Sequence, residues 1–366
     1  IRLKEQSYQE QIDIKNTYKL RELVSTLPPF AKSYFRGIET RTSSRTRIAY
    51  AYDLNIFFRF LHKMNPIFQK IEVKEITLAQ LEQLSPMDIE EYLDYVKVYE
   101  DEEQQIHTNK ERGIMRKLSS LKSFYSYFYR NESIKYNPVE LVQTPKFHEK
   151  AIIRLDLDEM EALLDQVDHG SKLTEKQKVF HQRTRIRDLA IMTLLLGTGI
   201  RVSECVGLNL EDVDLKNDGI KVHRKGGKEV IVYFGDEVEL ALLDYLEQRN
   251  QIVAQEGEEH ALFLSLQRRR IGVRAVENLV KKYSRAVTTM KNITPHKLRS
   301  TYGTNLYRET GDIYLVADVL GHADVNTTKK HYAAIDDDRR KQARNIVKLR
   351  KTLSDGGKTS ASTGGE

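Results

Sequence analysis

A histidine and an arginine at the start of a helix are the first residues whose types and spacing could do chemistry. In the run TPHKLR (294–299), Thr294 can cap a helix and Pro295 suits its first position. His296 and Arg299 then share one face, beside the exposed amides that make a helix N-terminus an anion site. A guanidinium there can grip two oxygens of a phosphate. Ordinary protein surfaces carry such a pair just as often, so the pair alone decides nothing.

Three further positions could contribute to an anion site. Arg201 follows a glycine turn, and Glu204, three residues later, could orient its guanidinium. Gly321 can end the preceding helix in the left-handed conformation, which presents His322 at a turn. Tyr332 lies ten positions after His322. Each has an ordinary explanation as well: a structural Arg–Glu pair, a helix cap, and one tyrosine among 19.

Two lysines lie in the turn of an expected β-hairpin. Residues 219–224 and 229–234 are the convincing strands of the chain. They flank Lys225, Gly226, Gly227 and Lys228, and the paired glycines suit a tight turn.

Taken in chain order, these features resemble the catalytic set of the tyrosine recombinases, the phage-integrase and Xer family. The resemblance covers both halves of the chain. Its most specific segments are GTGIRVSECVGLNLEDVD (197–214), HKLRSTYGT (296–304) and VADVLGHADVNTTKKHYA (316–333). Finding all three in order argues against a chance match. The length and the segment 27–54 look most like the single-recombinase XerS type.

The resemblance implies a phosphoryl transfer from DNA to a tyrosine and back, with no metal, ATP or other cofactor. Arg201 and Arg299 would stabilise the charge on the non-bridging phosphate oxygens, joined by a hydrogen bond from His322. Tyr332 matches the nucleophile. Because a phenol has an ordinary pKa of about 10, its attack at neutral pH requires proton removal or cationic surroundings.

The resemblance also implies two residues that transfer protons during the reaction. His296 matches the residue that assists as general base. Lys225 matches the hairpin lysine that protonates the departing 5′-oxygen, and Lys228 is the alternative. The spacing of ten residues from His322 to Tyr332 departs from that of many relatives, which is one shorter.

The basic side chains are unevenly distributed. The 366-residue chain has 59 Lys and Arg against 53 Asp and Glu, yet residues 267–308 carry eleven basic side chains and one acidic one. Such clustering is the electrostatic footprint of a polyanion, here double-stranded DNA, whereas a solvated helix face is the alternative. Most contacts should meet phosphates. The expected DNA-binding residues are Arg112, Lys117, Lys122, Lys228, Arg268, Arg270, Arg274, Lys281 and Lys282.

Helical periodicity dominates the chain and predicts a mainly α fold. Apolar stripes indicate helices over 45–63, from Ser85 onward, and over 109–130, which together build an all-helical core-binding domain. Further helices are expected in a mixed catalytic domain with a small antiparallel hairpin, over 185–196, 273–289, 295–309, 313–320 and around 327–334.

Two proline-containing stretches, at Asn137-Pro138 and Thr144-Pro145, divide the chain because proline ends helices and favours extended backbone. The expected organisation is a core-binding domain, a linker, a catalytic domain and a disordered Gly/Ser/Thr-rich tail. Their boundaries are 1–143, 144–152, 153–354 and 355–366.

The basic segment 339–351 is expected to take part in subunit assembly. Relatives dock the segment after the tyrosine into a neighbouring subunit, so the resemblance implies a homo-tetramer on paired sites, with Ile346 and Leu349 as apolar anchors. A tail that only adds phosphate contacts is the alternative.

The resulting hypothesis is a site-specific recombinase that works through a 3′-phosphotyrosyl intermediate and a Holliday junction, in chromosome dimer resolution. A mobile-element integrase or an invertase would share this chemistry, and a type IB topoisomerase-like enzyme is more distant. A non-catalytic DNA-binding protein should have lost some of the six catalytic residues. The single cysteine, Cys205, and the lack of a signal or spanning segment favour the bacterial cytoplasm.

Overall fold

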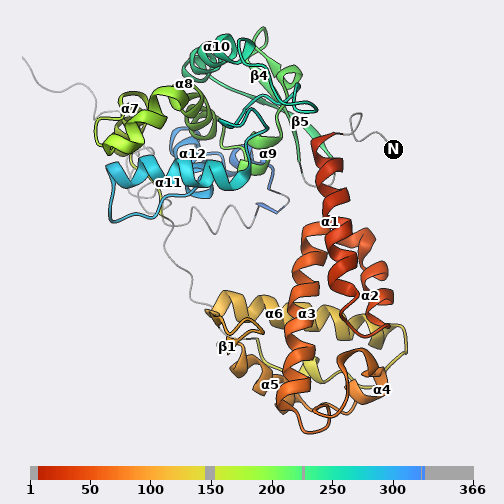
Figure 1. Cartoon of the computed structure of the whole chain (residues 1–366). Helices are drawn as coiled ribbons and strands as arrows, with labels where there is room; N and C mark the ends of the chain where they lie inside the picture. Colours follow the sequence, from red (N-terminus) through yellow and green to blue (C-terminus); the bar gives the residue numbers. More distant parts are fainter. Residues whose placement is uncertain (1–6, 145–152, 225–226, 323, 326–366) are drawn as a thin grey trace, which may run out of the picture. The chain divides into compact units, whose positions relative to one another are not determined.

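The computed structural model describes residues 7–144, 153–224, 227–322 and 324–325, and the chain divides into two units after Lys150 (Figure 1). Lys225, Tyr332 and the segment 339–351 lie outside the described residues, as do the helix expected around 327–334 and nearly all of the expected linker. Among the described helices, none has the length and apolarity needed to cross a bilayer.

The N-terminal unit is mainly helical and carries one short antiparallel hairpin, β1–β2. Its α-helices are α1 (Tyr8–Val24), α2 (Ala31–Gly37), α3 (Ser44–Met64), α4 (Leu78–Leu81), α5 (Pro86–Tyr95) and α6 (Glu111–Arg130). The hairpin strands are β1 (Val98–Glu100) and β2 (Ile106–Thr108), and the single-turn 3-10 helices are η2 (Glu39–Arg41), η3 (Val73–Glu75) and η4 (Pro138–Leu141).

The core of this unit forms where the apolar stripe of α6 meets α2 and α3. The stripe expected from the sequence is buried throughout, at Ile114, Leu118, Leu121, Tyr125 and Phe128. Aromatic rings fill the space between the helices in edge-to-face contacts, the arrangement that their quadrupoles favour. This packing fixes α6 and therefore decides which of its basic side chains reach solvent.

The C-terminal unit combines seven α-helices among its described residues with a three-stranded antiparallel sheet. The helices are α7 (Leu157–His169), α8 (Glu175–Thr198), α9 (Val202–Gly207), α10 (Asp236–Asn250), α11 (Val273–Val287), α12 (Pro295–Thr310) and α13 (Ile313–Leu320). The sheet has the order β3 (Val213–Asp214), β4 (Gly219–His223) and β5 (Glu229–Tyr233), and η5 (Leu210–Asp212) precedes it.

Helix α8 is the centre of this unit and packs against α7, α10 and α12 (Figure 1). Its last four turns are buried on most sides, as expected for residues 185–196, but the helix begins ten residues earlier than predicted. The first turns are polar and lack an apolar stripe, so periodicity does not reveal them. A capping box between Thr174 and Gln177 starts the helix instead.

The β4–β5 hairpin has the predicted position, with Ile220 opposite Val232. Two other strand pairings were not predicted: β1 with β2, and β3 with β4. The unpredicted strands β1, β2 and β3 contain only two or three residues each, and β1 and β2 alternate between exposed and half-buried positions. Segments of that length give too few alternations for a sequence pattern to register.

Candidate active site at the ends of helices α8 and α13

The C-terminal end of α13 is the structural centre of the candidate site. Gly321 ends the helix in the left-handed region, with φ of +63°, and the His322 amide closes the turn on the Ala317 carbonyl at 2.9 Å. A helix end leaves its last carbonyls without partners along the helix and carries a partial negative charge. It therefore attracts cationic donors.

Three arginines from separate segments donate to the consecutive carbonyls 318–321. Arg224 follows β4, Arg299 lies in the first turns of α12, and Arg201 is the N-cap residue of α9. The contacts are Arg224 Nη1 to Asp318 O (3.3 Å), Arg224 Nη2 to Val319 O (2.7 Å), Arg299 Nη2 to Leu320 O, and Arg201 Nη2 to Gly321 O (3.1 Å). One helix end thus gathers Arg201, Arg299 and the backbone of His322.

Arg299 also joins the end of α8 to this arrangement. Its side chain is only 5% exposed, and its Nη1 donates to the Gly199 carbonyl at 2.6 Å. Gly199 has φ of +63°, and a Cβ there would overlap the Tyr302 ring. Glycine is thus required for the α8 end to turn toward Arg299.

Arg201 is oriented by a buried carboxylate. Glu204 accepts from the Arg201 guanidinium at 2.7 Å and from the Arg201 backbone amide at 2.8 Å. The Glu204 side chain is buried, whereas that of Arg201 is 38% exposed. The guanidinium is therefore held in place while still reaching solvent, as expected of a group that must meet an anion without reorganising.

A cavity of about 830 Å³ opens beside this cluster. Arg201, Arg224, Lys228 and His322 line it, together with Asp318 and Asp324. The cavity contains hydrogen-bond donors from three segments of the chain. Such a set suits one phosphate of a polymer backbone better than a small neutral molecule.

Of the remaining catalytic candidates, the structure describes only His296. His296 is exposed on the first turn of α12, three residues before Arg299. Pro295 occupies the first helical position as expected, but the Thr294 side chain makes no capping hydrogen bond, so that part of the prediction was wrong. Lys225 and Tyr332 lie outside the described residues, and their roles stay predictions.

The structure gives Lys117 a role other than the expected phosphate contact. Its side chain is 3% exposed, donates to Asn109 Oδ1 at 3.1 Å and lies 3.7 Å from Asp53 Oδ1. Burial lowers the pKa of Lys117, and burial also raises that of Asp53, to which Arg116 donates. An ammonium enclosed between α3 and α6 holds these helices together and does not face a ligand.

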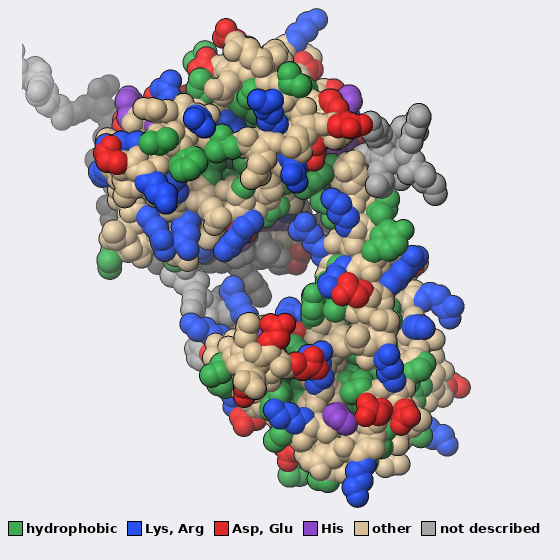
Figure 2. Space-filling model, in the orientation of Figure 1, with side chains coloured by type: hydrophobic (Ala, Val, Ile, Leu, Met, Phe, Trp, Pro, Cys, Tyr) green, Lys and Arg blue, Asp and Glu red, His purple; other side chains and the backbone are tan. Residues whose placement is uncertain are grey.

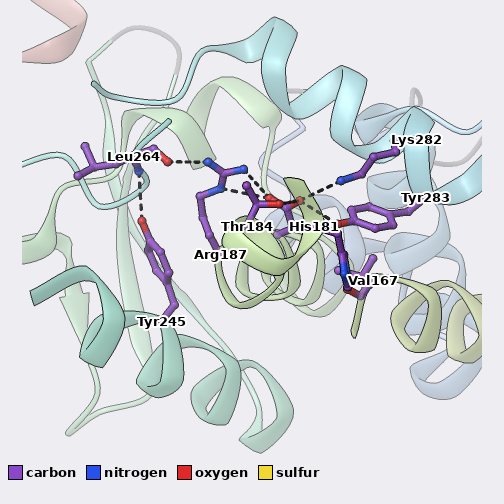
Figure 3. Close-up of polar contacts among 9 residues, drawn as sticks. Val167, His181, Thr184, Arg187, Tyr245, Leu264, Lys282 and Tyr283 are labelled. Carbon is purple, nitrogen blue, oxygen red and sulfur yellow. Dashed lines mark hydrogen bonds and ion pairs between the residues drawn. The ribbon is translucent and has the colours of Figure 1, made fainter. Parts of the chain in front are cut away.

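Lys282 and Arg270 are likewise occupied within the fold. Lys282 Nζ lies 3.3 Å from the buried carboxylate of Asp188, beside the Tyr283 hydroxyl that donates to the same carboxylate (Figure 3). Arg270 donates to the carbonyls of Leu208 at 2.7 Å and Val206 at 3.2 Å, and so fixes the segment after α9. These internal contacts orient both side chains, and their contacts with DNA stay predictions.

The other expected DNA-binding residues reach the surface. Figure 2 shows Lys and Arg side chains gathered over the region of α11 in the C-terminal unit. Lys122 is half-buried and donates to Thr144, and Arg274 pairs with Glu277 across one helical turn. The exposed members are Arg112, Lys228, Arg268, Arg274 and Lys281.

Comparison with known proteins decides the family. The phage integrase family model matches residues 154–339, and the model of the phage integrase N-terminal SAM-like domain matches residues 31–132. The chain belongs to the phage integrase family. It is a tyrosine-type site-specific DNA recombinase of the Xer type.

Several relatives span nearly the whole chain. Tyrosine recombinase XerC of Caldanaerobacter subterraneus subsp. tengcongensis is 36% identical over 86% of this chain and 84% of its own length. Tyrosine recombinase XerS of Lactococcus lactis subsp. cremoris is 30% identical over 89% and 97%. The expected Xer resemblance is confirmed by these matches.

Solved structures confirm the fold. The XerH site-specific recombinase, in a post-cleavage complex with its difH substrate, has a TM-score of 0.62 at 20% identity over 83% of this chain and 80% of that one. The Tn1549 transposon integrase, in complex with transposon right end DNA, has a TM-score of 0.58 at 20% identity over 86% and 98%.

Sequence reasoning missed one residue of this site, Arg224. Its position directly before Lys225 was the only available signal, because its acceptors at 318 and 319 are more than ninety residues away in sequence. No local pattern predicts such a pairing. Glu204, by contrast, was recognised from its spacing to Arg201, and the structure confirms that contact.

Proposed function

We propose that this recombinase cleaves and rejoins double-stranded DNA through Tyr332. The phenolic oxygen attacks the backbone phosphorus, the bond from phosphorus to the 5′-oxygen breaks, and a 3′-phosphotyrosyl link with a free 5′-hydroxyl results. His296 takes the phenolic proton, and Lys225 gives a proton to the departing oxygen, with Lys228 as the alternative donor. The reverse reaction with a partner strand rejoins the DNA and passes through a Holliday junction.

The observation that carries this proposal is the meeting of Arg201, Arg299 and His322 at one helix end. The carbonyls of residues 320 and 321 each hold one of the two guanidinium groups, and His322 is the next residue along the chain. Negative charge develops on the non-bridging oxygens as the phosphorus is attacked. Donors fixed before the reaction stabilise that charge without having to reorganise.

For the biological role, we propose chromosome dimer resolution by a homo-tetramer on paired sites, with the segment 339–351 exchanged between subunits. The similarity to a XerS protein over nearly the full length of both chains supports this choice. Integration of a mobile element or inversion of a DNA segment would use the same chemistry. An inverted-repeat site beside the gene would favour those two roles.

Trapping on nicked DNA tests the chemistry. Genomic fragments retained by the Tyr332→Phe variant are sequenced to find the bound site, and a nick near its cleavage position prevents rejoining. Wild-type protein should then accumulate a covalent protein–DNA adduct, whereas Tyr332→Phe should bind the duplex without forming one. An adduct of equal yield from Tyr332→Phe would reject Tyr332 as the nucleophile.

A further inference from the structure

Arg224 connects the β4–β5 hairpin with the end of α13. Its backbone amide donates to the Lys228 carbonyl at 2.8 Å, and its own carbonyl accepts from Gly227 at 3.2 Å, so the residue is fixed at the base of the turn. From there its side chain extends to the carbonyls of residues 318 and 319. One residue thus ties two segments that both line the cavity.

We propose that Arg224 is a positioning residue for DNA cleavage, which acts by holding the last turn of α13 where Arg201 and His322 need it. This inference rests on the proposed function. Arg224 holds carbonyls 318 and 319, Arg299 holds carbonyl 320, and Arg201 contacts carbonyl 321. A shift of the turn therefore moves the Gly321 acceptor of Arg201 together with His322.

The close packing of Arg224 on Gly321 supports a fixed position. A Cβ at residue 321 would overlap the Arg224 guanidinium, so the absence of a side chain there is what admits it. The Arg224 Nε is buried and makes no hydrogen bond within the described part of the chain. Burying a donor in this way is unfavourable, so the two carbonyl contacts and the packing must hold the guanidinium in place.

The competing role for Arg224 is direct contact with a DNA phosphate, because Arg224 also lines the cavity. The two roles differ in how duplex binding depends on salt. Losing one phosphate contact lowers the slope of log Kd against log salt concentration by about 0.9, because one fewer counterion is released. A positioning residue leaves that slope unchanged.

The test compares Arg224→Met, which removes the guanidinium but keeps an apolar stem, with wild-type protein on nicked DNA. The single-turnover cleavage rate at saturating DNA should fall by about 10–100-fold, the effect expected when reacting groups are misplaced by about 1 Å. The salt slope of binding should stay the same. Arg224→Lys, whose ammonium can still reach a carbonyl, should recover part of the rate.

Lys216→Ala is the matched control. Lys216 is an exposed cation of the same three-stranded sheet, in the turn between β3 and β4, and its removal changes the net charge by the same amount. Its cleavage rate and salt slope should match those of wild-type protein. Thermal unfolding of all variants identifies any that fail to fold, and Arg224→Lys then carries the comparison.

A double-mutant cycle with His322→Ala tests whether Arg224 affects cleavage through His322 and its neighbours. If Arg224 acts by positioning His322 and its neighbours, Arg224→Met should slow the His322→Ala variant much less than it slows wild-type protein. Wild-type cleavage rates in Arg224→Met, a salt slope lower by about 0.9, or independent effects in the cycle would each overturn the inference. Absence of any wild-type adduct would instead overturn the proposed function on which it rests.

Discussion

The surroundings of Arg299 fix the position of its guanidinium in the site. An almost fully buried guanidinium is costly unless its donors are satisfied. Here two of them meet carbonyls at the ends of α8 and α13. Each of these helices ends in a glycine with positive φ, which turns the chain away and leaves the carbonyls accessible. The position of the cation is therefore set by backbone geometry at two places.

At the same scale, Arg201→Ala tests the phosphate-gripping role. The single-turnover cleavage rate should fall by about 10²–10³-fold, because a fixed donor to the developing charge is lost. The salt slope of duplex binding should also fall by about 0.9, since one phosphate contact disappears. Cleavage at the wild-type rate at saturating DNA would contradict the role. Lys216→Ala again serves as the charge control.

Helices α3 and α6 are joined by a buried charge cluster that no pattern in the sequence predicts. Asp53 is almost fully buried, Arg116 and Lys117 supply its positive partners, and its Oδ1 accepts no hydrogen bond within the described residues. Removing one member of a buried pair leaves the other charge without compensation. The cluster therefore fixes the relative position of the two helices.

Asp53→Asn tests this arrangement. The variant should lose about 3 kcal/mol of unfolding free energy, because the Lys117 ammonium stays buried without its carboxylate. Adding Lys117→Met should restore much of the loss, since both buried charges are then gone. Urea denaturation of the three proteins measures the differences. A double variant less stable than Asp53→Asn alone would contradict the account.

Helix α11 provides a matched pair of neighbouring lysines. Lys281 is exposed, whereas Lys282 faces the buried carboxylate of Asp188. Lys281→Ala should lower the salt slope of DNA binding by about 0.9, and Lys282→Met should leave the slope unchanged. Lys282→Met should instead lower the melting temperature, because Asp188 loses a partner. Equal slopes for wild-type protein and Lys281→Ala would remove this residue from the proposed DNA surface.

On the scale of the molecule, the sequence predicts the mainly helical N-terminal domain and the β4–β5 hairpin well. Amphipathic stripes and glycine turns are local signals, so α3, α6, α12 and α13 are found near their expected positions. The α6 stripe is buried residue by residue as predicted. The family resemblance adds roles that no local pattern contains.

The sequence does not predict which basic side chains make contacts inside the fold. Lys117, Arg270 and Lys282 find partners 61 to 94 positions away in the chain. These partners are Asp53 for Lys117, Asn209 for Arg270 and Asp188 for Lys282. One clue was available for Lys117, which lies three residues after Ile114 and four before Leu121, on the apolar stripe itself. Arg224 was missed for the same reason of distance.

The most direct test of the central claim is mass spectrometric identification of the residue that becomes attached to DNA. Adduct from nicked duplex is digested with protease and nuclease, and the peptide carrying a nucleotide is sequenced. The account predicts a single modified peptide with the phosphodiester on Tyr332. Attachment at any other side chain, or a nucleotide linked through its 5′-phosphate, would contradict it.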